Sequence, residues 1–332
     1  MFKKITFPII ALAIVHVVMS FRSNPTKIIH GLTAMRRLSM SSAADISVMI
    51  NGMPGLMALE TAKACLDRGM NVLDVGFTGP RNQLEEIVVE GAKNSQIVKL
   101  VKGPGISPDA PELLKAIRSS NENLVIVDYT HPSSALGNIQ CYIDCNCDFV
   151  MGTTGLDQSE IDAAFTKGGN HAVIAPNMAK QIVAVQFGLL EMAERFPGSF
   201  NNYELEVSES HQSTKADTSG TAKAIVKNLA ILNGANFNTE DIVKLRTKPE
   251  QLAFNVPEDA LGGHAFHTYT LTSADKSVVF ELKHNVCGRR IYAEGTVDAV
   301  KFINEVANGV NKAGSAKRLY NMIDVLECGK MV

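Results

Sequence analysis

The stretch ISVMINGMPGLMALETAKACLDRG, residues 46–69, decides the predicted fold. Residues 46–51 form a short apolar run of the kind that fills a buried strand, and residues 55–69 form a helical pattern that closes at Gly69. A strand, a glycine turn and a helix in this order begin a βαβ unit. The sequence therefore predicts a parallel sheet that starts near residue 46.

The turn between that strand and helix reads NGMPGLMA, residues 51–58, with the spacing G-x-x-G-x-x-A set by Gly52, Gly55 and Ala58. A dinucleotide pyrophosphate meets a helix N-terminus at this place in nucleotide-binding folds. Pro54 makes the fingerprint atypical, and Gly and Pro also mark ordinary turns. The position directly after the first strand is what favours a cofactor loop.

The alternation of strands and helices continues through the first half of the chain. Short Val/Ile-rich runs separated by helical patterns are typical of a doubly wound parallel sheet, so we expect an α/β, Rossmann-type domain. The further predicted strands are 71–77, 96–101, 124–128, 148–152 and 171–176, and the helical patterns include 109–119 and 132–145.

The pattern changes after residue 178. A long helix is expected at 179–196, and strands that alternate as antiparallel strands do are expected at 202–210, 264–273 and 277–286. The tail returns to a helix and is expected to pack on the first domain. We therefore predict a dinucleotide-binding domain of residues 45–177 and 293–332, and a second, α+β mixed-sheet domain of residues 178–292 for substrate binding and oligomerisation.

Composition narrows the class of partner. Of 332 residues, 45% are hydrophobic and 20% charged, which is ordinary for a globular protein. Residues 1–44 hold six basic side chains and no acid, which leaves 26 basic against 34 acidic residues and a net charge of −8 for the rest. A protein with this net negative charge is a poor candidate for binding nucleic acid, and small anionic ligands would need local positive sites.

Residues 1–44 read as a targeting presequence. Lys3 and Lys4 precede an apolar core of signal-peptide length, small residues precede Phe21, and the following stretch is basic and hydroxyl-rich like a transit peptide. A signal and a transit segment joined at a Phe resemble the two-part plastid presequence of algae with secondary plastids. We expect plastid localisation without membrane attachment of the mature form; a plain secretory signal is the alternative.

No metal site is predicted. Cys141, Cys145 and Cys147 cluster without a fourth ligand at zinc spacing, and the six cysteines are better read as reduced and packed. His264 and His267 are three apart in a predicted strand, so their side chains face opposite sides of the sheet.

Polar residues at strand ends are the remaining cofactor candidates, because ligands gather at the carboxyl ends of parallel strands. Asp74 has the spacing of a ribose-binding acid but lies mid-strand in the prediction, so Thr78 and Arg81 are better placed for the ribose or its 2′-phosphate. Thr153 and Thr154 are placed to orient a nicotinamide, although a turn with a helix cap explains them equally well. These ends read VDYTHP (127–132), MGTTGLD (151–157) and APNMAKQ (175–181).

Residues 208–225, SESHQSTKADTSGTAKAI, gather unlike polar groups just before a helix. A helix N-terminus with Ser/Thr hydroxyls binds anions, and Gly220 allows close approach to the backbone. Lys215 offers a charge for a carboxylate, and His211 is the natural proton donor near neutral pH. A dicarboxylate with one reacting centre would use all of these. The alternative is a solvated loop before a helix capped by Asp217, Ser219 or Thr221.

The block ESHQSTKADTSGTA resembles the signature of the dihydrodipicolinate reductase family, whose bacterial form usually reads E-x-H-H-x-x-K-x-D-x-P-S-G-T-A. Gln212 stands for the second His and no Pro precedes Ser219, as in the plant form. The resemblance spans about residues 46–327 and extends to the blocks IAPNMAKQIVA, FPGSFNNYELEVSESHQ, HAFHTYTLTS, HNVCGRRIYAEGTVDAV and YNMIDVL.

The resemblance implies NAD(P)H-dependent reduction of 4-hydroxy-tetrahydrodipicolinate to tetrahydrodipicolinate in the diaminopimelate route to lysine. It implies His211 as acid/base and Lys215 as a second donor or carboxylate contact, in a homodimer or homotetramer. Leu56 stands where the family commonly has Lys or Arg, so one phosphate contact is expected to be missing. The implied substrate-binding residues are Gln212, Gly220, Thr221, His284 and Arg289, and the implied cofactor-binding residues are Gly52, Met53, Pro54, Gly55, Leu56, Met57, Gly152, Thr153, Thr154, Pro176, Asn177 and Met178. The strand ends add Thr78, Arg81, Asp128 and Thr130 as cofactor candidates.

Two rival functions stay open at this stage. A cofactor-binding sensor without turnover would have no need of a proton donor such as His211. A related dehydrogenase acting on another substrate would share most of the motifs. The sequence leaves open the choice between NADPH and NADH and between dimer and tetramer.

Overall fold

The structure is a computed structural model and describes residues 43–166, 168–310 and 317–328. Residues 1–42, which hold nearly all of the predicted presequence, lie outside the described residues. Within the described part of the chain, no helix is both long enough and apolar enough to cross a membrane.

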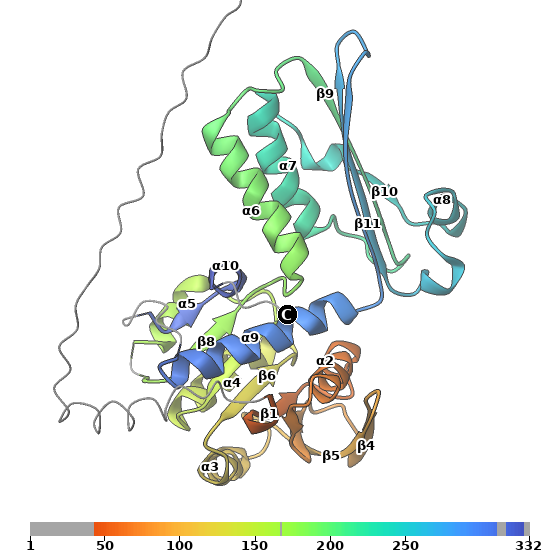
Figure 1. Ribbon diagram of the computed structural model, residues 1–332. Coiled ribbons are helices and arrows are strands. Elements are labelled where there is room, and N and C mark those ends of the chain that lie inside the picture. Colours follow the sequence, from red (N-terminus) through yellow and green to blue (C-terminus); the bar gives the residue numbers. More distant parts are fainter. Residues whose placement is uncertain (1–42, 167, 311–316, 329–332) are drawn as a thin grey trace, which may run out of the picture. The chain divides into compact units, whose positions relative to one another are not determined.

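A six-stranded sheet with the order β13-β8-β7-β6-β1-β2 lies at the centre of the N-terminal half (Figure 1). All five neighbouring pairs in it are parallel. Every residue of β6 is buried, as expected for a parallel strand covered on both faces. The predicted α/β class is confirmed. The strands are β1 Ser47–Asn51, β2 Asn71–Val72, β6 Leu124–Asp128, β7 Asp148–Met151, β8 Ala172–Ile174 and β13 Leu319–Tyr320.

Two hydrophobic clusters cover the two faces of this sheet. Val48 and Ile50 of β1 belong to one cluster, and Met49 between them belongs to the other. The first cluster includes residues of α2 and α9, and the second includes residues of α3 and α4. The helices are α2 Leu56–Asp67, α3 Ala110–Ser120, α4 Pro132–Asp144, α5 Gln158–Ala164, α9 Arg290–Ala307 and α10 Met322–Glu327.

The sequence prediction was wrong about the second and third strands. The chain bends at Asp74, so the predicted strand 71–77 becomes β2 of the large sheet and β3, Val75–Thr78, of a separate three-stranded sheet. The strand predicted at 96–101 is β5, Ser95–Lys102, which pairs with β3 and with the unpredicted β4, Glu86–Glu90. Ile97 is 56% exposed while Val98 is buried, a half-solvated pattern that does not suit a central parallel strand.

A second sheet has the order β10-β9-β11-β12. Strands β9 Tyr203–His211, β11 His264–Ser273 and β12 Val279–Cys287 pair antiparallel as predicted, whereas β10 Val243–Leu245 pairs parallel to β9 and was not predicted. The predicted mixed sheet is confirmed, and the boundaries of the two domains stay predictions. The remaining elements are α6 Lys180–Arg195, α7 Gly220–Asn233, α8 Lys248–Ala253 and the short 3-10 helices η2 Ala43–Asp45, η3 Thr239–Asp241 and η4 Glu258–Ala260.

One face of the second sheet packs on α6 and α7. Val207 of β9 and Tyr269 and Leu271 of β11 share a core cluster with Ala193 of α6 and Ile225 of α7. Because side chains alternate along a strand, the next residues on this covered face are Glu209 and His211 on β9 and His267 on β11. Toward one end of the sheet, core positions are therefore occupied by ionisable side chains.

No disulfide joins any of the six cysteines, all of which lie in the described part of the chain. Four of them are buried as expected, but Cys287 is exposed, so the expectation of packed thiols is wrong for that residue. Cys65, Cys141 and Cys147 are buried, and burial raises the pKa of each thiol to about 12. Thiols with so high a pKa are protonated at neutral pH and serve as packing groups.

Candidate functional site

The loop after β1 is shaped by two glycines. Gly52 has φ +104°, and a Cβ there would lie 2.5 Å from the carbonyl oxygen of Tyr129. A Cβ on Gly55 would lie 2.7 Å from the carbonyl oxygen of Gly52. Thr78 Oγ1 donates a hydrogen bond of 2.7 Å to the carbonyl oxygen of Met53. The backbone of this loop is therefore exposed to a ligand and held in place by β3.

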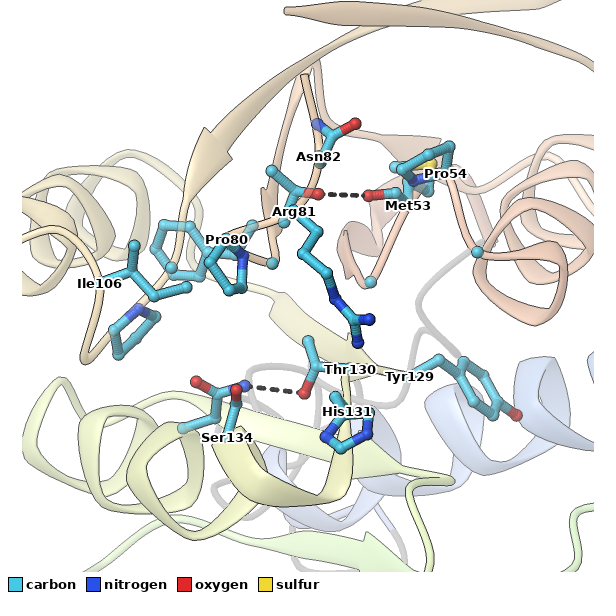
Figure 2. Close-up of a pocket in the computed structure, with 18 of the residues that line it drawn as sticks. Met53, Pro54, Pro80, Arg81, Asn82, Ile106, Tyr129, Thr130, His131 and Ser134 are labelled. Atoms are coloured by element: carbon cyan, nitrogen blue, oxygen red, sulfur yellow. Dashed lines mark hydrogen bonds between the residues drawn. The ribbon is translucent and has the colours of Figure 1, made fainter. Parts of the chain in front are cut away.

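A pocket of about 730 Å³ opens beside this loop (Figure 2). In Figure 2 the Arg81 side chain extends from the loop after β3 toward Thr130 and His131. Arg81, His131 and Tyr129 are the titratable residues among the described residues that line the pocket, and Arg81 carries a permanent positive charge. Seven predicted cofactor residues line it, namely Gly52, Met53, Pro54, Gly55, Thr78, Arg81 and Thr130.

The pocket suits an anionic dinucleotide. The N-terminus of α2 follows Gly55, and the first turn of this helix carries no acidic residue, so its dipole favours negative charge at the loop. The backbone cradle, the helix end and the Arg81 guanidinium together match a pyrophosphate with a ribose, and a ribose phosphate where one is present.

Nine of the sixteen predicted cofactor residues do not line this pocket, Leu56 and Met57 among them, and neither does Asp74, which the sequence argued against. Asp74 is exposed at the bend between β2 and β3, not mid-strand as the sequence indicated. Leu56 is 62% exposed, and Met57 packs on the hydrophobic cluster of α2 and α9. The structure thus gives neither Leu56 nor Met57 a place among the lining residues.

Asp128 is buried at the end of β6 and braces the pocket wall. Its carboxylate accepts hydrogen bonds from the backbone N–H and hydroxyl of Thr130 at 2.8 and 2.7 Å, from Tyr142 Oη at 2.6 Å and from Asn138 Nδ2 at 3.0 Å. Thr153 Oγ1 donates to the Thr130 carbonyl at 3.1 Å. These side chains therefore position the 128–131 loop, and neither Tyr142 nor Asn138 was predicted as a site residue.

Gly152 and Thr154 follow β7. A Cβ on Gly152 would lie 2.2 Å from Cε1 of Tyr129, so the glycine makes room for this ring, which lines the pocket. Tyr129 was not predicted as a site residue. Thr154 is exposed. The predicted nicotinamide contacts of Thr153 and Thr154 stay predictions.

The loop after β8 reaches the beginning of α7. Asn177 Nδ2 lies 3.5 Å from Thr221 Oγ1, and Asn177 Oδ1 accepts a hydrogen bond from the N–H of Ala179 at 2.9 Å. Met178 is buried, with its carbonyl oxygen against Gly295 of α9, and Pro176 is exposed. This loop therefore links a predicted cofactor segment to a predicted substrate segment.

Glu209 and Arg246 hold the loop that follows β9. The fully buried Glu209 carboxylate pairs with Arg246 Nη2 at 2.5 Å and accepts the N–H of Ser219 at 3.0 Å. Arg246 Nε donates to the Lys215 carbonyl at 2.7 Å. Arg246 lies 31 residues beyond Lys215 in the chain. It was not predicted as a site residue, because β10, the strand that ends directly before it, was not predicted.

The loop itself contains the predicted ligand groups. Lys215 Nζ pairs with the carboxylate of Asp217 at 2.8 Å, and the Asp217 side chain is 77% exposed. Gln212 is half-buried, and the His211 carbonyl accepts a hydrogen bond from Gln251 at 2.7 Å. A charged and largely exposed loop therefore follows His211, whose backbone is held by Gln251.

The helix α7 begins at Gly220, and Ser219 is its cap. Ser219 Oγ accepts the N–H of Ala222 at 3.4 Å, so Ser219 and not Asp217 or Thr221 fills this role. Gly220 is exposed and Thr221 is half-buried. The helix end thus offers N–H groups and a hydroxyl to an anion.

His211 lies against two further histidines. Its Nε2 is 3.3 Å from Nε2 of His267, and the His267 ring stacks on His284 with ring centroids 4.5 Å apart. Burial lowers the pKa of His211 to about 4 and that of His267 to about 2, and burial also lowers the pKa of His284. All three rings are therefore neutral at pH 7 in the free protein, contrary to the simple view of His211 as a cation.

His267 was considered in the sequence analysis only as a metal ligand beside His264. His264 does face the other way, with Nε2 2.8 Å from Ser210 Oγ. The structure instead brings His267, His211 and Glu209 within 4.8 Å of one another. The Glu209 carboxylate already pairs with Arg246 and accepts the N–H of Ser219, so it is poorly placed to bind a metal ion as well. Acid–base chemistry therefore suits Glu209, His211 and His267 better than metal binding.

Arg289 lies in the connection between β12 and α9, directly before the helix. It is half-buried, and its Nη1 would lie 3.6 Å from a Cβ placed on Gly263. Arg289 thus lies near the beginning of β11, the strand that carries His267.

Two family descriptions match the chain and together cover all three sheets. Residues 46–178 match "Dihydrodipicolinate reductase, N-terminus", and residues 183–326 match "Dihydrodipicolinate reductase, C-terminus". The chain belongs to the dihydrodipicolinate reductase family. The resemblance inferred from the sequence motifs is therefore confirmed.

Plant relatives show the same family. The chain is 39% identical over 308 residues to the probable 4-hydroxy-tetrahydrodipicolinate reductase 2, chloroplastic, of Oryza sativa, covering 92% of this chain and 89% of the relative. It is 40% identical over 294 residues to the 4-hydroxy-tetrahydrodipicolinate reductase 2, chloroplastic, of Arabidopsis thaliana, covering 88% and 80%. Both plant relatives are named as chloroplastic reductases.

A solved structure shares the fold. The dipicolinate-bound dihydrodipicolinate reductase of Paenisporosarcina sp. TG-14 aligns with a TM-score of 0.56 and 18% identity, over 84% of this chain and 98% of that one. At this identity the comparison supports the family fold alone.

Proposed function

We propose that this chain reduces 4-hydroxy-tetrahydrodipicolinate to tetrahydrodipicolinate with NAD(P)H in the diaminopimelate route to lysine. In this reaction a hydride and a proton enter, and the ring hydroxyl leaves as water. The observation that carries the proposal is the 208–225 segment, which places buried His211, Lys215 and the beginning of α7 around one loop. The Asn177–Thr221 contact joins that loop to a predicted cofactor segment.

The cofactor would supply the hydride. Residues 52–55 would hold its pyrophosphate at the α2 N-terminus, and Arg81 would meet the ribose or its phosphate. The exposed Leu56 offers no cation, so discrimination between NADPH and NADH is expected to be weak.

The substrate itself would make His211 an acid. In the free protein burial keeps the pKa of His211 near 4, and the positive Arg246 and Lys215 also lower it. A dicarboxylate adds negative charge close by and favours the protonated imidazole. Lys215, Arg289 and the N–H groups at Gly220 and Thr221 would hold the carboxylates, so binding and protonation are coupled.

The direct test is oxidation of NADPH and NADH by the purified full chain on the product of dihydrodipicolinate synthase. Lys215→Ala should weaken substrate binding by about 2–3 kcal/mol, because a charge-assisted bond is lost, and should lower turnover by misplacing the ring. Lys227→Ala, which removes an exposed lysine of α7, is the matched control. Equal kinetics of the two variants would contradict the assignment of Lys215.

The cofactor loop has its own test. Gly52→Ala places a Cβ 2.5 Å from a backbone oxygen at positive φ, so NADPH affinity should fall by about 100-fold or more. Gly79→Ala is the control, because Gly79 also lines the pocket and a Cβ there meets nothing within 4 Å. A normal affinity of the Gly52→Ala variant would place the cofactor elsewhere.

Both rival functions have distinct outcomes. A sensor would bind NADPH without oxidising it on any substrate. A related dehydrogenase would oxidise NADPH on another substrate and would not bind pyridine-2,6-dicarboxylate, a flat analogue of the proposed ring.

We also propose that residues 1–44 are a two-part plastid presequence, as their basic, acid-free composition and the chloroplastic relatives support. A chain that starts near Ala44 should be soluble and active. In cells, replacing Phe21 by a charged residue should keep a fluorescent fusion out of the plastid. Unchanged import would contradict the two-part presequence.

A homodimer or homotetramer completes the proposal. Strand β12 is an edge strand, and its Val279 and Phe280 are 57% and 50% exposed. An apolar edge of this kind is commonly covered by another chain. Light scattering on the purified full chain should give two or four copies, and a monomer would contradict this part.

A further inference from the structure

Polar side chains occupy the end of the helix-covered face of the second sheet. On β11, Leu271 and Tyr269 are followed on the same face by His267, and His267 pairs with His284 of β12 and with Glu209 of β9. Glu209 is fully buried, His267 is 1% exposed and His211 is 7% exposed. Burying ionisable groups at positions that suit leucine is costly, so a structural role alone gives no reason for them.

The hydrogen bonding of these groups is incomplete. Nδ1 of His267, Nε2 of His284 and Oη of Tyr269 are buried and have no partner among the described residues. The Nε2–Nε2 contact with His211 is the hydrogen bond of the His267 side chain in the described part of the chain. Native proteins leave few buried polar atoms unpaired, so each of these three atoms calls for an explanation, and a catalytic role is one.

The Nε2–Nε2 contact of 3.3 Å restricts the protonation of the pair. Only one hydrogen fits between the two nitrogens, so one ring donates and the other accepts. Nδ1 of His211 makes no hydrogen bond to a described residue, and it is the nitrogen left to face a ligand. Glu209, Arg246, Lys215, His264 and His284 are the other titratable or charged groups that act on the two rings.

Charge around the pair is nearly balanced before a ligand binds. Glu209 is paired with Arg246, and Lys215 is paired with the exposed Asp217. A bound dicarboxylate adds two negative charges to this balance. The least costly response is uptake of one proton by the neutral imidazole pair, because two adjacent imidazolium ions would repel each other.

We propose that His211 and His267 act as one acid, with His267 as the positioning residue. The pair takes up a single proton when the dicarboxylate binds and shares it across the Nε2–Nε2 contact. Nδ1–H of His211 then gives a proton to the departing hydroxyl, which leaves as water, while His267 passes its Nε2 proton to His211. Both rings end neutral, so the proton balance of the reaction is complete. The identity of the ligand rests on the function proposed above.

Proton uptake on ligand binding tests the pair without turnover. Pyridine-2,6-dicarboxylate is titrated into the full chain at pH 7.5 by calorimetry, in phosphate and in Tris, whose ionisation enthalpies differ. The wild-type chain should take up roughly one proton per ligand. His267→Gln keeps a hydrogen-bonding side chain that cannot titrate, and its uptake should fall to about a quarter or less, with ligand affinity within about three-fold.

Kinetics of the same variant give a second readout. His267→Gln should lower kcat by about 10-fold or more with little change in KM, and the high-pH limb of the kcat profile should move to lower pH. His171→Gln is the control, because it makes the same substitution at a histidine just before β8 that contacts Asp148 and is not among the groups that act on the pair. This variant should behave like the wild type in both measurements.

Each alternative outcome is distinct. Ligand binding by the wild-type chain without proton uptake overturns the pair even if no His267 variant folds. Loss of turnover in EDTA that Zn²⁺ restores also overturns it, because Glu209, His211 and His267 would then be metal ligands. Failure of the wild-type chain to bind the analogue at all overturns the proposed function as well.

Discussion

The nucleotide pocket and the histidine cluster are built in opposite ways. The pocket depends on backbone shape within a short segment, where Gly52 and Gly55 leave no room for side chains. The cluster depends on side chains from β9, β11 and β12 and on Arg246 after β10, which strand pairing brings together. The first site is local in sequence and the second is not.

This difference has a physical consequence. The pocket is lined by glycine, proline and hydroxyl residues, and its Arg81 is exposed, so its charges are screened by water. The cluster is buried, so each charge in it strongly affects its neighbours. Changes in the cluster should therefore alter stability and pH dependence, whereas changes at the pocket rim should alter cofactor affinity by small factors.

The largest effect should come from Arg246→Ala, which leaves Glu209 buried without its cation. Breaking one partner of a buried pair typically costs about 3–5 kcal/mol of unfolding free energy. The control is Lys248→Ala, which breaks an ion pair of similar length with Glu258 whose two side chains are 59% and 71% exposed. That variant should lose much less, because water screens an exposed pair. Urea denaturation measures both, and similar losses would contradict the distinction between buried and exposed pairs.

Acid should destabilise the protein through the cluster. The folded-state pKa values of His211 and His267, about 4 and about 2, lie below the ordinary value of 6.5. The unfolded chain therefore binds protons first as pH falls, and stability is lost from about pH 6.5 downward. Between pH 7 and 5 the loss through these residues should be on the order of 3 kcal/mol. Urea denaturation of wild type and His267→Phe should show a smaller loss in the variant, and equal slopes would refute this.

His211→Ala should lower turnover about 10²-fold or more with little change in apparent substrate affinity, because the proton is needed in the transition state. Affinity for NADPH, measured separately by fluorescence, should stay within about two-fold, since His211 is not among the residues that line the pocket. A parallel loss of NADPH affinity would show that the two regions are not independent. A near-normal turnover would favour the solvated-loop interpretation of this segment.

The smallest effect is expected at the rim of the pocket. Leu56→Lys should tighten both NADPH and NADH several-fold, because an exposed phosphate contact contributes roughly 1 kcal/mol. Arg81→Ala should weaken NADPH more than NADH. A strong NADPH preference that survives the loss of Arg81 would contradict the placement of the ribose phosphate beside it.

The sequence predicted what depends on local patterns. The α/β class, the glycine loop and the 208–225 segment were all visible, because strand, turn and helix signals lie close together in the chain. The order of the first strands was not predicted, because the bend at Asp74 that sends the chain into the three-stranded sheet leaves no mark in the hydrophobicity of the sequence. Burial of β5 on one side only is likewise a property of its neighbours.

The site residues divide in the same way. His211 and Lys215 were found from a motif, but Glu209, Arg246 and His267 act through contacts across 37 to 58 positions of sequence. The prediction that His264 and His267 face opposite sides of the sheet is confirmed. It considered the two histidines only as metal ligands, so the contact of His267 with His211 on β9 was missed. Asp128 and Gly152 were predicted to bind the cofactor. In the structure Asp128 also positions Thr130, and Gly152 leaves room for the Tyr129 ring.

The pair formed by Lys215 and Asp217 has a consequence for the design of inhibitors. The loop carries its own carboxylate on the cation that a ligand would use, so Asp217 is a built-in competitor. An inhibitor gains from Lys215 only the difference between its own contact and the one it displaces. Because Asp217 is exposed and water screens its pair with Lys215, the competition removes only part of the gain from a carboxylate directed at Lys215. Further potency would have to come from groups that reach the helix end or His211.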